Sequence, residues 1–264
     1  MLRSGIHTLI GKLSKLWRII ATAIAFTVFG LGGSLLPFIV VPILYLLPGG
    51  PMVRERRAKA YIHYIMRCFV ETMRCLGILT YCVDRRAEYN RPGQLILANH
   101  PSLIDVVFLI AFIRRADCVV KSSLTQNLFT RFSIGLAGYI ANDDPEKILE
   151  AAAASLERGN SLIIFPEGTR TTPGQPMELQ RGAANIALRC EAPITPVVIT
   201  CEPTTLTKNM PWYRIPPRRF HFTMNIRDKI PIEEFLDEPH PSIASRRLTE
   251  FLRNYFTQEL ASHE

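Results

Sequence analysis

Short apolar runs alternate with helical stretches between residues 79 and 200, and this alternation strongly limits the folds open to the chain. The apolar runs predict strands at Leu79–Val83, Leu95–Ala98, Cys118–Lys121, Tyr139–Ala141, Leu162–Phe165 and Thr195–Thr200. The stretches between them predict helices at Ser102–Ile113, Ser123–Leu136, Pro145–Arg158 and Arg181–Cys190. Strands that alternate with helices require crossover connections. The sequence therefore predicts an α/β fold, a single domain with a mostly parallel sheet flanked by helices.

Three further segments complete this domain. Arg54–Leu76 has apolar residues at helical spacing and arginines on its other side, which predicts a helix with one buried face. A strand at Phe220–Ile226 and a helix at about Pro241–Leu260 follow the alternating region. Asp144 followed by Pro145 is a strong helix-start signal, because it places a capping side chain before a proline at the first helical position. We assign residues 54–264 to this domain.

The N-terminal residues 1–53 have a different character. No charged residue occurs between Arg18 and Arg54, and Ile19–Leu47 is almost wholly apolar. It is long enough to span a bilayer, which takes roughly 20 residues. The glycines in Gly30–Gly33 and the two prolines, Pro37 and Pro42, predict that it breaks into two shorter helical pieces. A re-entrant hairpin and a transmembrane helix both remain open, and the basic flanks favour the hairpin. A cleaved signal peptide fits poorly, because the apolar core is too long and basic residues follow it.

The positive charge is concentrated in the same part of the chain. Residues 1–60 hold eight basic residues against one acidic residue, a net charge of +7, while the whole chain carries +8. Basic residues beside an apolar segment are attracted to anionic lipid headgroups. We therefore expect a protein on the cytoplasmic face of the inner (plasma) membrane that contacts membrane lipids. Because the folded domain is nearly neutral, we expect it not to bind nucleic acid.

The cysteines and most histidines give no sign of a metal or disulfide site. The six cysteines form no CxxC pair and lie in apolar runs, which is typical of reduced core residues in the cytosol. The histidines other than His100 do not repeat a ligand spacing.

The stretch LILANHPSLIDVV turns from apolar to polar at Asn99 and His100. If the strand ends at Ala98, His100 lies at the carboxyl edge of the sheet, where open α/β folds place their ligand sites. Asp105 then lies near the start of the next helix and could orient the imidazole as a base. Alternatively, Ser102 and Asp105 form a capping box that only secures the helix start. These residues alone leave both interpretations open.

A second polar turn follows the strand at Leu162–Phe165. Pro166, Glu167 and Gly168 force a turn at the same edge of the sheet, and Thr169 and Arg170 follow. An arginine beside free amides can bind a phosphate, and a carboxylate can accept a hydrogen bond from a hydroxyl. An ordinary polar turn is the alternative for this stretch taken alone.

The pairing of NHPSLID with FPEGTR resembles the glycerolipid acyltransferase family, whose best-known members are the 1-acylglycerol-3-phosphate acyltransferases. The match covers roughly residues 54–230 and includes a third, proline-containing block, Thr195–Val198. The resemblance implies that His100 is the general base and that Asp105 orients it. It also implies that Glu167, Gly168, Thr169 and Arg170 bind the acceptor. The acyl donor would be an acyl carrier protein or acyl-CoA thioester, a co-substrate that needs no cofactor or metal.

Three other features bear on the acceptor. Arg181, before Gly182, stands where relatives often have a lysine and could support the phosphate; Lys121 also matches a basic position of the family. Relatives that use lysophosphatidate commonly have an arginine where this chain has Asn142 and Asp143. The stretch Lys208–Phe220 mixes Trp212 and Tyr213 with arginines, a composition that suits either a lipid headgroup boundary or an exposed loop.

The sequence thus favours an O-acyltransferase for a lysophospholipid such as 1-acylglycerol-3-phosphate. The alternatives are transfer to another lipid or of a specialised chain, a thioester or lipid hydrolase, and a noncatalytic scaffold. A G-x-S-x-G elbow is absent, which disfavours a serine hydrolase. The presence of His100, Asp105 and Glu167 disfavours the scaffold.

Overall fold

The computed structural model describes residues 2–122, 126, 131–211 and 213–262, and within them the strands form one sheet. The order is β1-β7-β6-β2-β5-β3-β4. The strands are β1 (Leu79–Val83), β2 (Leu95–Ala98), β3 (Ala116–Lys121), β4 (Ile140–Asn142), β5 (Ser161–Ile164), β6 (Ile194–Glu202) and β7 (Phe220–Ile226).

The sheet is mostly parallel, as predicted. Among its neighbouring pairs only β6 and β7 run antiparallel within the described residues. Central strand β2 pairs with β5 at Leu97↔Ile164 and with β6 at Ala98↔Val197. Every expected strand is present, with bounds shifted by a few residues at most. The reversed direction of β7 and β1 had no signal in the sequence.

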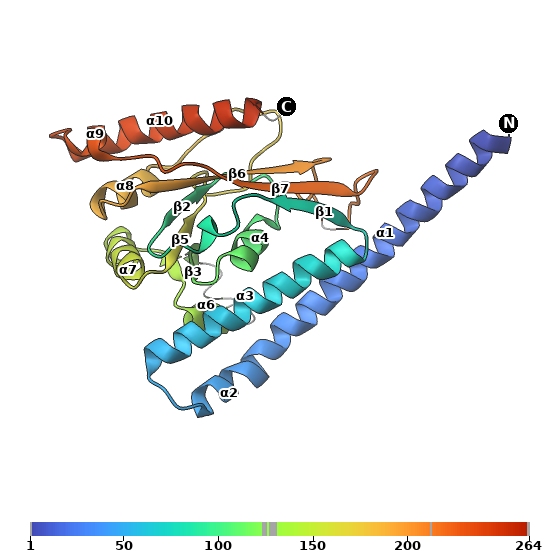
Figure 1. Cartoon of the computed structure of the whole chain (residues 1–264), viewed down its shortest axis with the longest axis horizontal. Helices are drawn as coiled ribbons and strands as arrows, with labels where there is room; N and C mark the ends of the chain where they lie inside the picture. Colours follow the sequence, from blue (N-terminus) through green and yellow to red (C-terminus); the bar gives the residue numbers. More distant parts are fainter. Residues whose placement is uncertain (1, 123–125, 127–130, 212, 263–264) are drawn as a thin grey trace.

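Helices cover both faces of the sheet (Figure 1). One face packs against α3 (Pro51–Cys75) and α4 (Asp105–Phe112), and the other packs against α7 (Pro145–Glu157), α8 (Arg181–Arg189) and α10 (Pro241–Ala261). Strand β2 serves both cores: Ile96 and Ala98 belong to the first, and Leu95 and Leu97 to the second. Successive side chains of a strand point to opposite faces, so a fully apolar strand is what a doubly covered sheet requires.

The shorter elements agree with the sequence where they are described. The Asp144 carboxylate caps α7 by accepting from the main-chain N–H of Glu146 (3.1 Å) and Lys147 (3.5 Å). The predicted helix Ser123–Leu136 falls partly outside the described residues, and its described end belongs to α6 (Arg131–Ala137). A 3-10 turn, η2 (Glu88–Asn90), and a short helix, α9 (Glu233–Leu236), complete the domain.

The N-terminal segment is not broken at its glycines, so that expectation was wrong. Helix α1 (Leu2–Leu35) continues through Gly30–Gly33, and the irregularity follows at η1 (Leu36–Val40), a π-helical turn before α2 (Val41–Leu46). Glycine lowers helix propensity by only about 1 kcal/mol and keeps its backbone hydrogen bonds, whereas proline removes one. The distortion therefore coincides with Pro37, and Pro42 is accommodated at the start of α2.

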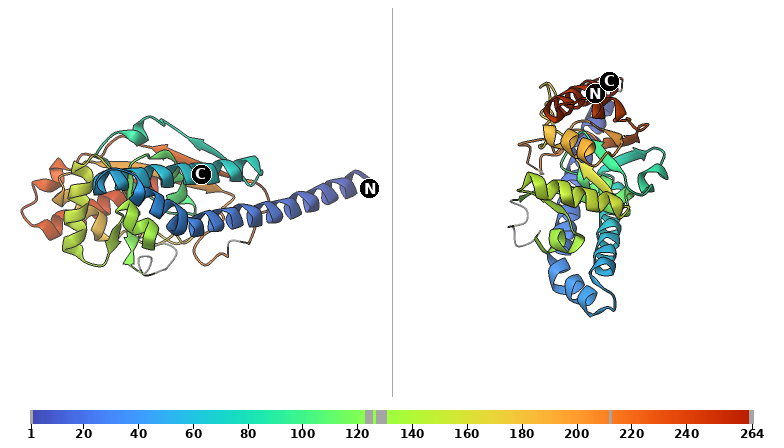
Figure 2. Two further views of the ribbon diagram at one scale, coloured as in Figure 1. Left: turned by 90° about the horizontal axis from the view of Figure 1, so that it is seen from below. Right: turned by 90° about the vertical axis from the view of Figure 1, so that its left-hand side faces the viewer.

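The chain reverses after α2, and α3 returns alongside α1 (Figures 1 and 2). The Phe29 ring stacks on Phe69 at a centroid distance of 4.4 Å, and the Trp17 indole N–H donates to the carbonyl of Leu76 (3.0 Å). The observed hairpin thus pairs α1 with α3 and differs from the predicted one, which lay within Ile19–Leu47. Figure 2 shows that α1 projects beyond the rest of the chain.

The outer face of this hairpin is apolar. By length and composition, Leu13–Leu46 is a candidate membrane segment, with a mean hydropathy of 2.2 and only 7% of its most apolar stretch buried. Exposed large side chains on it include Leu16, Trp17, Ile20, Ile24, Val28, Leu31, Phe38, Ile39, Ile43 and Leu46. A contiguous apolar surface of this kind is unusual on a monomer in water and is typical of a membrane or protein contact.

Two buried polar contacts fix α3 to the domain. The Lys59 ammonium, whose side chain is 3% exposed, lies 2.6 Å from Asp117 on β3 and 2.6 Å from Glu55 one helical turn earlier. The His63 Nδ1 atom lies 2.8 Å from the carbonyl of Ile110 in α4. Because a buried charge is costly without its partner, Lys59 and Asp117 hold α3 in one position.

Candidate active site

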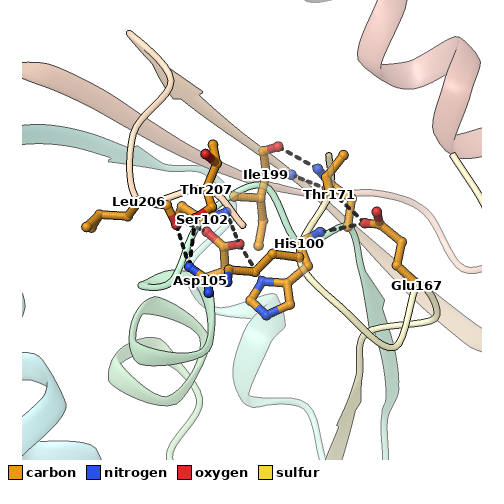
Figure 3. A network of polar contacts seen from close by, with 10 residues as sticks. His100, Ser102, Asp105, Glu167, Thr171, Ile199, Leu206 and Thr207 are labelled. Carbon is orange, nitrogen blue, oxygen red and sulfur yellow. Dashed lines mark hydrogen bonds and ion pairs between the residues drawn. The ribbon is translucent and has the colours of Figure 1, made fainter. Parts of the chain in front are cut away.

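Parallel pairing of β2 and β5 brings the two polar turns together. The strands end at Ala98 and Ile164, so both turns leave the same edge of the sheet. The main-chain N–H of Thr171 donates to the carbonyl of His100 (2.7 Å). The main-chain N–H of His100 in turn donates to Glu167 Oε1 (2.9 Å). Figure 3 shows these contacts, which join two turns that lie more than sixty residues apart in the sequence.

His100 and Asp105 form a close pair at this edge. The imidazole Nδ1 lies 2.7 Å from Asp105 Oδ2, and the Asp105 side chain is fully buried. The same Oδ2 accepts from the main-chain N–H of Ser102 (2.7 Å), and the Ser102 hydroxyl donates to Oδ1. Asp105 therefore orients the imidazole and also anchors the turn before α4. The predicted contact between the imidazole and Asp105 is present, whereas the predicted capping box forms only in part, because the N-cap of α4 is Ile104 and no side chain caps this helix.

The surroundings of this pair leave one nitrogen of the imidazole open. Burial raises the pKa of Asp105, and hydrogen bonds from His100 and Ser102 act in the opposite direction. If Nδ1 donates its proton to Asp105, Nε2 carries the free lone pair. Nε2 has no hydrogen-bond partner among the described residues, and the His100 side chain is 17% exposed. This nitrogen can accept a proton from a bound molecule.

A stacking contact also restrains the orientation of the imidazole ring plane. The Phe165 ring stacks on it at a centroid distance of 4.1 Å and an interplanar angle of 21°. Phe165 is the first residue after β5, so the second turn determines the orientation of the base on the first.

Glu167 binds main chain inside the site. Its Oε1 accepts from the His100 N–H and from the Thr171 hydroxyl (2.8 Å), and burial raises the pKa of this carboxyl against these two bonds. In Figure 3 the carboxylate faces the backbone of His100, not its ring. Gly168 follows with a φ of +64°, which favours glycine, and Thr169 is half-buried in the same turn. Glu167 therefore holds the two turns together.

Arg170 contacts a third segment, the loop between β6 and β7. Its Nη1 donates to the carbonyls of Leu206 (3.0 Å) and Thr207 (2.9 Å). The main-chain N–H of Leu103 donates to the same carbonyl of Leu206 (3.0 Å). Arg170 thus closes the site from the side of β6, and part of its guanidinium is already committed to the protein.

Three polar residues in this network were not assigned a site role from the sequence. The Asn99 side chain exchanges two hydrogen bonds with the backbone of Ile199 on β6 (2.7 and 2.8 Å), and Ser102 and Thr171 bind the two carboxylates. Ser102 had a signal, because it belongs to the predicted capping box. Asn99 had none, because its partner is main chain of a strand one hundred residues away.

The remaining predicted site residues lie outside this network. Arg181 begins α8, is exposed, and lines a groove against Arg246, Thr249 and Arg253 of α10. Lys121 ends β3 at the same carboxyl edge as His100 and Arg170, because β3 runs parallel to β5, and it pairs in register with Asn142. Arg181 follows Gln180, whose main-chain N–H donates to the carbonyl of Pro166 (2.7 Å), so Arg181 also starts from this edge.

The described residues contain no group of three or more His, Cys, Asp or Glu side chains that could hold a metal ion. All six cysteines are free thiols. The groups that the site offers are a base, two carboxylates and backbone amides, which suit proton transfer to and from a bound hydroxyl.

A mostly parallel sheet covered by helices, with a His–Asp pair at its carboxyl edge, is typical of α/β enzymes. Residues 82–200, a little under half of the chain, match the family model described as Acyltransferase.

Several curated relatives have the same name. A 1-acyl-sn-glycerol-3-phosphate acyltransferase of Cocos nucifera is 31% identical over 175 residues, which cover 63% of this chain and 54% of that protein. The enzyme of that name from Helicobacter pylori is 29% identical over 124 residues, which cover 44% of this chain and 52% of that protein. The chain spans about half the length of the curated relatives it matches.

A solved structure shares the whole fold. The crystal structure of the 1-acyl-sn-glycerophosphate acyltransferase from Thermotoga maritima superposes with a TM-score of 0.69 at 18% identity. The alignment covers 95% of this chain and 98% of that one, so the similarity includes the N-terminal helices. The predicted fold class and the predicted resemblance to acyltransferases are both confirmed.

Proposed function

We propose that the protein transfers a fatty acyl group from an acyl thioester to the free hydroxyl of a lysophospholipid such as 1-acylglycerol-3-phosphate. The observation that carries this proposal is the His100–Asp105 pair with an open Nε2, held by a Phe165–Arg170 turn. Relatives named 1-acyl-sn-glycerol-3-phosphate acyltransferases support the acceptor. The donor is either acyl carrier protein or coenzyme A.

In this proposal His100 acts as a general base without a covalent intermediate. Nε2 accepts the proton of the acceptor hydroxyl as its oxygen attacks the thioester carbonyl. Asp105 stabilises the imidazolium that forms. The tetrahedral intermediate then expels the thiolate. The thiolate accepts the proton that Nε2 received from the acceptor hydroxyl, and the products are an ester and a free thiol. A thioester is already activated, so a positioned base, worth about 10² to 10⁴ in rate, and close approach of the substrates suffice.

The acceptor phosphate would meet two cations at the carboxyl edge. Arg170 has one nitrogen engaged with loop carbonyls, which leaves the rest of its guanidinium for a phosphate. Lys121 is exposed at the end of β3 and supplies a second cation. In this proposal Glu167, Gly168 and Thr169 hold the turn after β5 in the conformation that presents Arg170 to the phosphate.

The apolar hairpin would hold the enzyme on the membrane that contains its acceptor. Its exposed face matches the interior of a leaflet, and its basic flanks match anionic headgroups of a cytoplasmic surface. We therefore place the protein on the cytoplasmic face of the inner (plasma) membrane, with residues 1–53 as the anchor and residues 54–264 as the acyltransferase domain.

The test is product analysis with purified full-length protein. The protein is incubated with labelled acyl carrier protein or acyl-CoA and 1-oleoyl-lysophosphatidate, and labelled lipids are separated. We expect phosphatidate with at least one donor. Free fatty acid in place of the ester would instead assign a hydrolase, in which water takes the place of the acceptor hydroxyl.

A variant at the base makes the test specific. His100→Ala should lower kcat by about 10² to 10⁴ while thermal unfolding remains close to that of the unmodified protein. Full activity in that variant would remove the base assignment. An acceptor panel with other lysolipids then defines the headgroup.

A further inference from the structure

A small cavity lies between α1 and the loop that joins β6 to β7. Arg18 and Thr22 of α1 line it together with Arg214 of the loop. Apolar side chains, including Phe26, Met73 and Phe220, complete the wall. No acidic residue is among the described residues that line it. The cavity thus combines two guanidinium groups with an apolar wall.

Arg18 is a buried cation without a matching anion. The residue is 8% exposed, and the hydrogen bond described for it joins Nη2 to the carbonyl of Pro217 (2.7 Å). Its Nε is buried and has no hydrogen-bond partner, and no carboxylate within salt-bridge distance of it is found in the described residues. Buried charges in proteins are normally paired, because an isolated one is strongly disfavoured.

Thr22 adds a second unpartnered group one helical turn later. The residue is 4% exposed, and its buried Oγ1 has no hydrogen-bond partner. Because residues four apart lie on the same face of a helix, Arg18 Nε and Thr22 Oγ1 face the same cavity. Two unsatisfied donors beside a second guanidinium favour an anionic oxygen between them. A water molecule would satisfy the hydrogen bonds and would leave the charge of Arg18 unbalanced.

The free space in the cavity is about 20 Å³, which is room for one water-sized group. A phosphate oxygen has that size, and the remainder of a headgroup would lie over the exposed Arg214. Arg18 belongs to the candidate membrane segment, and exposed Lys15, Arg218 and Arg219 surround the region with positive charge. Trp212 of the same loop lies outside the described residues. A ligand with an anionic head and an apolar tail suits both the cavity and its position.

We propose that this cavity binds the phosphate of a membrane lipid, with Arg18 and Thr22 holding one oxygen and Arg214 covering the headgroup. The polar ligands of this cavity are on α1 and the loop, whereas Leu206, which also lines it, accepts from Arg170; the cavity therefore adjoins the proposed catalytic site. Two sources share this chemistry: the phosphodiester of a surrounding phospholipid and the phosphomonoester of the acceptor.

The proposal is tested by thermal unfolding of the full-length protein in detergent micelles, without an acyl donor. Micelles contain phosphatidylglycerol or, as a control that has no phosphate, diacylglycerol at the same mole fraction. A third arm contains lysophosphatidate. Lipid at about 100 times its Kd should raise the Tm by roughly 5–10 °C for a chain of this size. The Tm should rise with phosphatidylglycerol, with lysophosphatidate, or with both, and stay unchanged with diacylglycerol.

Matched variants separate the cavity from general surface charge. Thr22→Val keeps the shape and Arg18→Met keeps most of the length, and each should lose at least half of the shift. Arg219→Gln removes one charge from the same loop outside the cavity and should keep the full shift. Without lipid, Arg18→Met should be at least as stable as the unmodified protein, because it removes an unpaired buried charge.

Three results would overturn the proposal. The first is an equal Tm in all three kinds of micelle. The second is a full shift in both cavity variants, which would assign the effect to surface charge. The third is an equal loss of shift in Arg219→Gln. A shift with lysophosphatidate alone would identify the acceptor as the source of the phosphate, and a shift with phosphatidylglycerol would identify the surrounding lipid. Because no acyl transfer is measured, the outcome is independent of the proposed enzymatic function.

Discussion

Substitution of Asp105 by Asn separates the two tasks of this carboxylate. The carbonyl oxygen of Asn can accept from the Ser102 N–H and from His100 Nδ1, as Oδ2 does now, and its amide can donate to the Ser102 hydroxyl. The geometry of the turn and the tautomer of His100 would be kept. The negative charge beside the imidazole would be lost.

The size of the effect follows from the distance between the groups. His100 becomes positively charged when it takes the acceptor proton, and its Nδ1 lies 2.7 Å from Asp105 Oδ2. Two unit charges whose centres are about 4 Å apart attract by about 4 kcal/mol at an effective dielectric constant of about 20. The neutral hydrogen bond that remains is worth about 1 kcal/mol. The difference of about 3 kcal/mol predicts a decrease in kcat of about 10².

Stability should change little. Burial raises the pKa of Asp105, so the negative charge of this carboxylate costs the folded state free energy relative to the unfolded state. Removing the charge offsets the poorer hydrogen bonds of the amide, and we expect the free energy of unfolding to stay within about 1 kcal/mol.

The assay is steady-state acyl transfer together with urea unfolding of the same preparation. Ser102→Ala is the control: it removes the hydroxyl bond to Oδ1, keeps the N–H bond to Oδ2, and should lower kcat less than tenfold. Normal turnover of Asp105→Asn with a clear loss of stability would refute the reasoning, because Asp105 would then act on the turn alone.

The other predictions concern the residues around the pair. Arg170→Gln keeps a donor for the carbonyls of Leu206 and Thr207 and loses the charge, so the acceptor KM should rise by about tenfold or more with near-normal stability; an unchanged KM would exclude a phosphate contact. Asn99→Ala leaves the buried N–H and carbonyl of Ile199 without partners, which should cost about 2–4 kcal/mol in urea unfolding, and a cost below that of a surface substitution would contradict it. Burial raises the pKa of Glu167, so its contribution to stability is fully present below the unfolded pKa of about 4.3 and is lost as pH rises through the higher folded value. Glu167→Gln does not titrate, and its stability relative to the unmodified protein should therefore increase from about pH 4 to pH 7; a constant difference would show that Glu167 has an ordinary pKa.

The sequence was informative wherever local patterns determine structure. Apolar runs identified the strands, Asp144 and Pro145 identified a helix start, and the spacing of His100 and Asp105 identified the pair. These features depend on residues that are close together in the sequence, so the periodicity of apolar residues and the helix-capping signals can predict them.

What could not be predicted depends on contacts between distant segments. Glu167 and Arg170 were expected to bind the acceptor, and the sequence did not show that each also binds main chain, Glu167 at His100 and Arg170 at Leu206 and Thr207. Backbone groups carry no residue-specific signal, so a sequence motif does not reveal them as partners. The reversed direction of β7 is a similar case, because it follows from the path of a long loop.

The contacts of α3 fix the position of the turn that carries His100 relative to helix α1. Helix α4 starts at Asp105 and rests on α3 through His63 and Ile110, and α3 is the returning arm of the apolar hairpin. A bilayer that receives the outer face of α1 would therefore meet His100 at one constant depth, without a flexible tether between them. The reactive hydroxyl of a membrane lipid also lies at a nearly constant depth in the bilayer. Such a lipid would therefore reach His100 by lateral diffusion in the membrane alone.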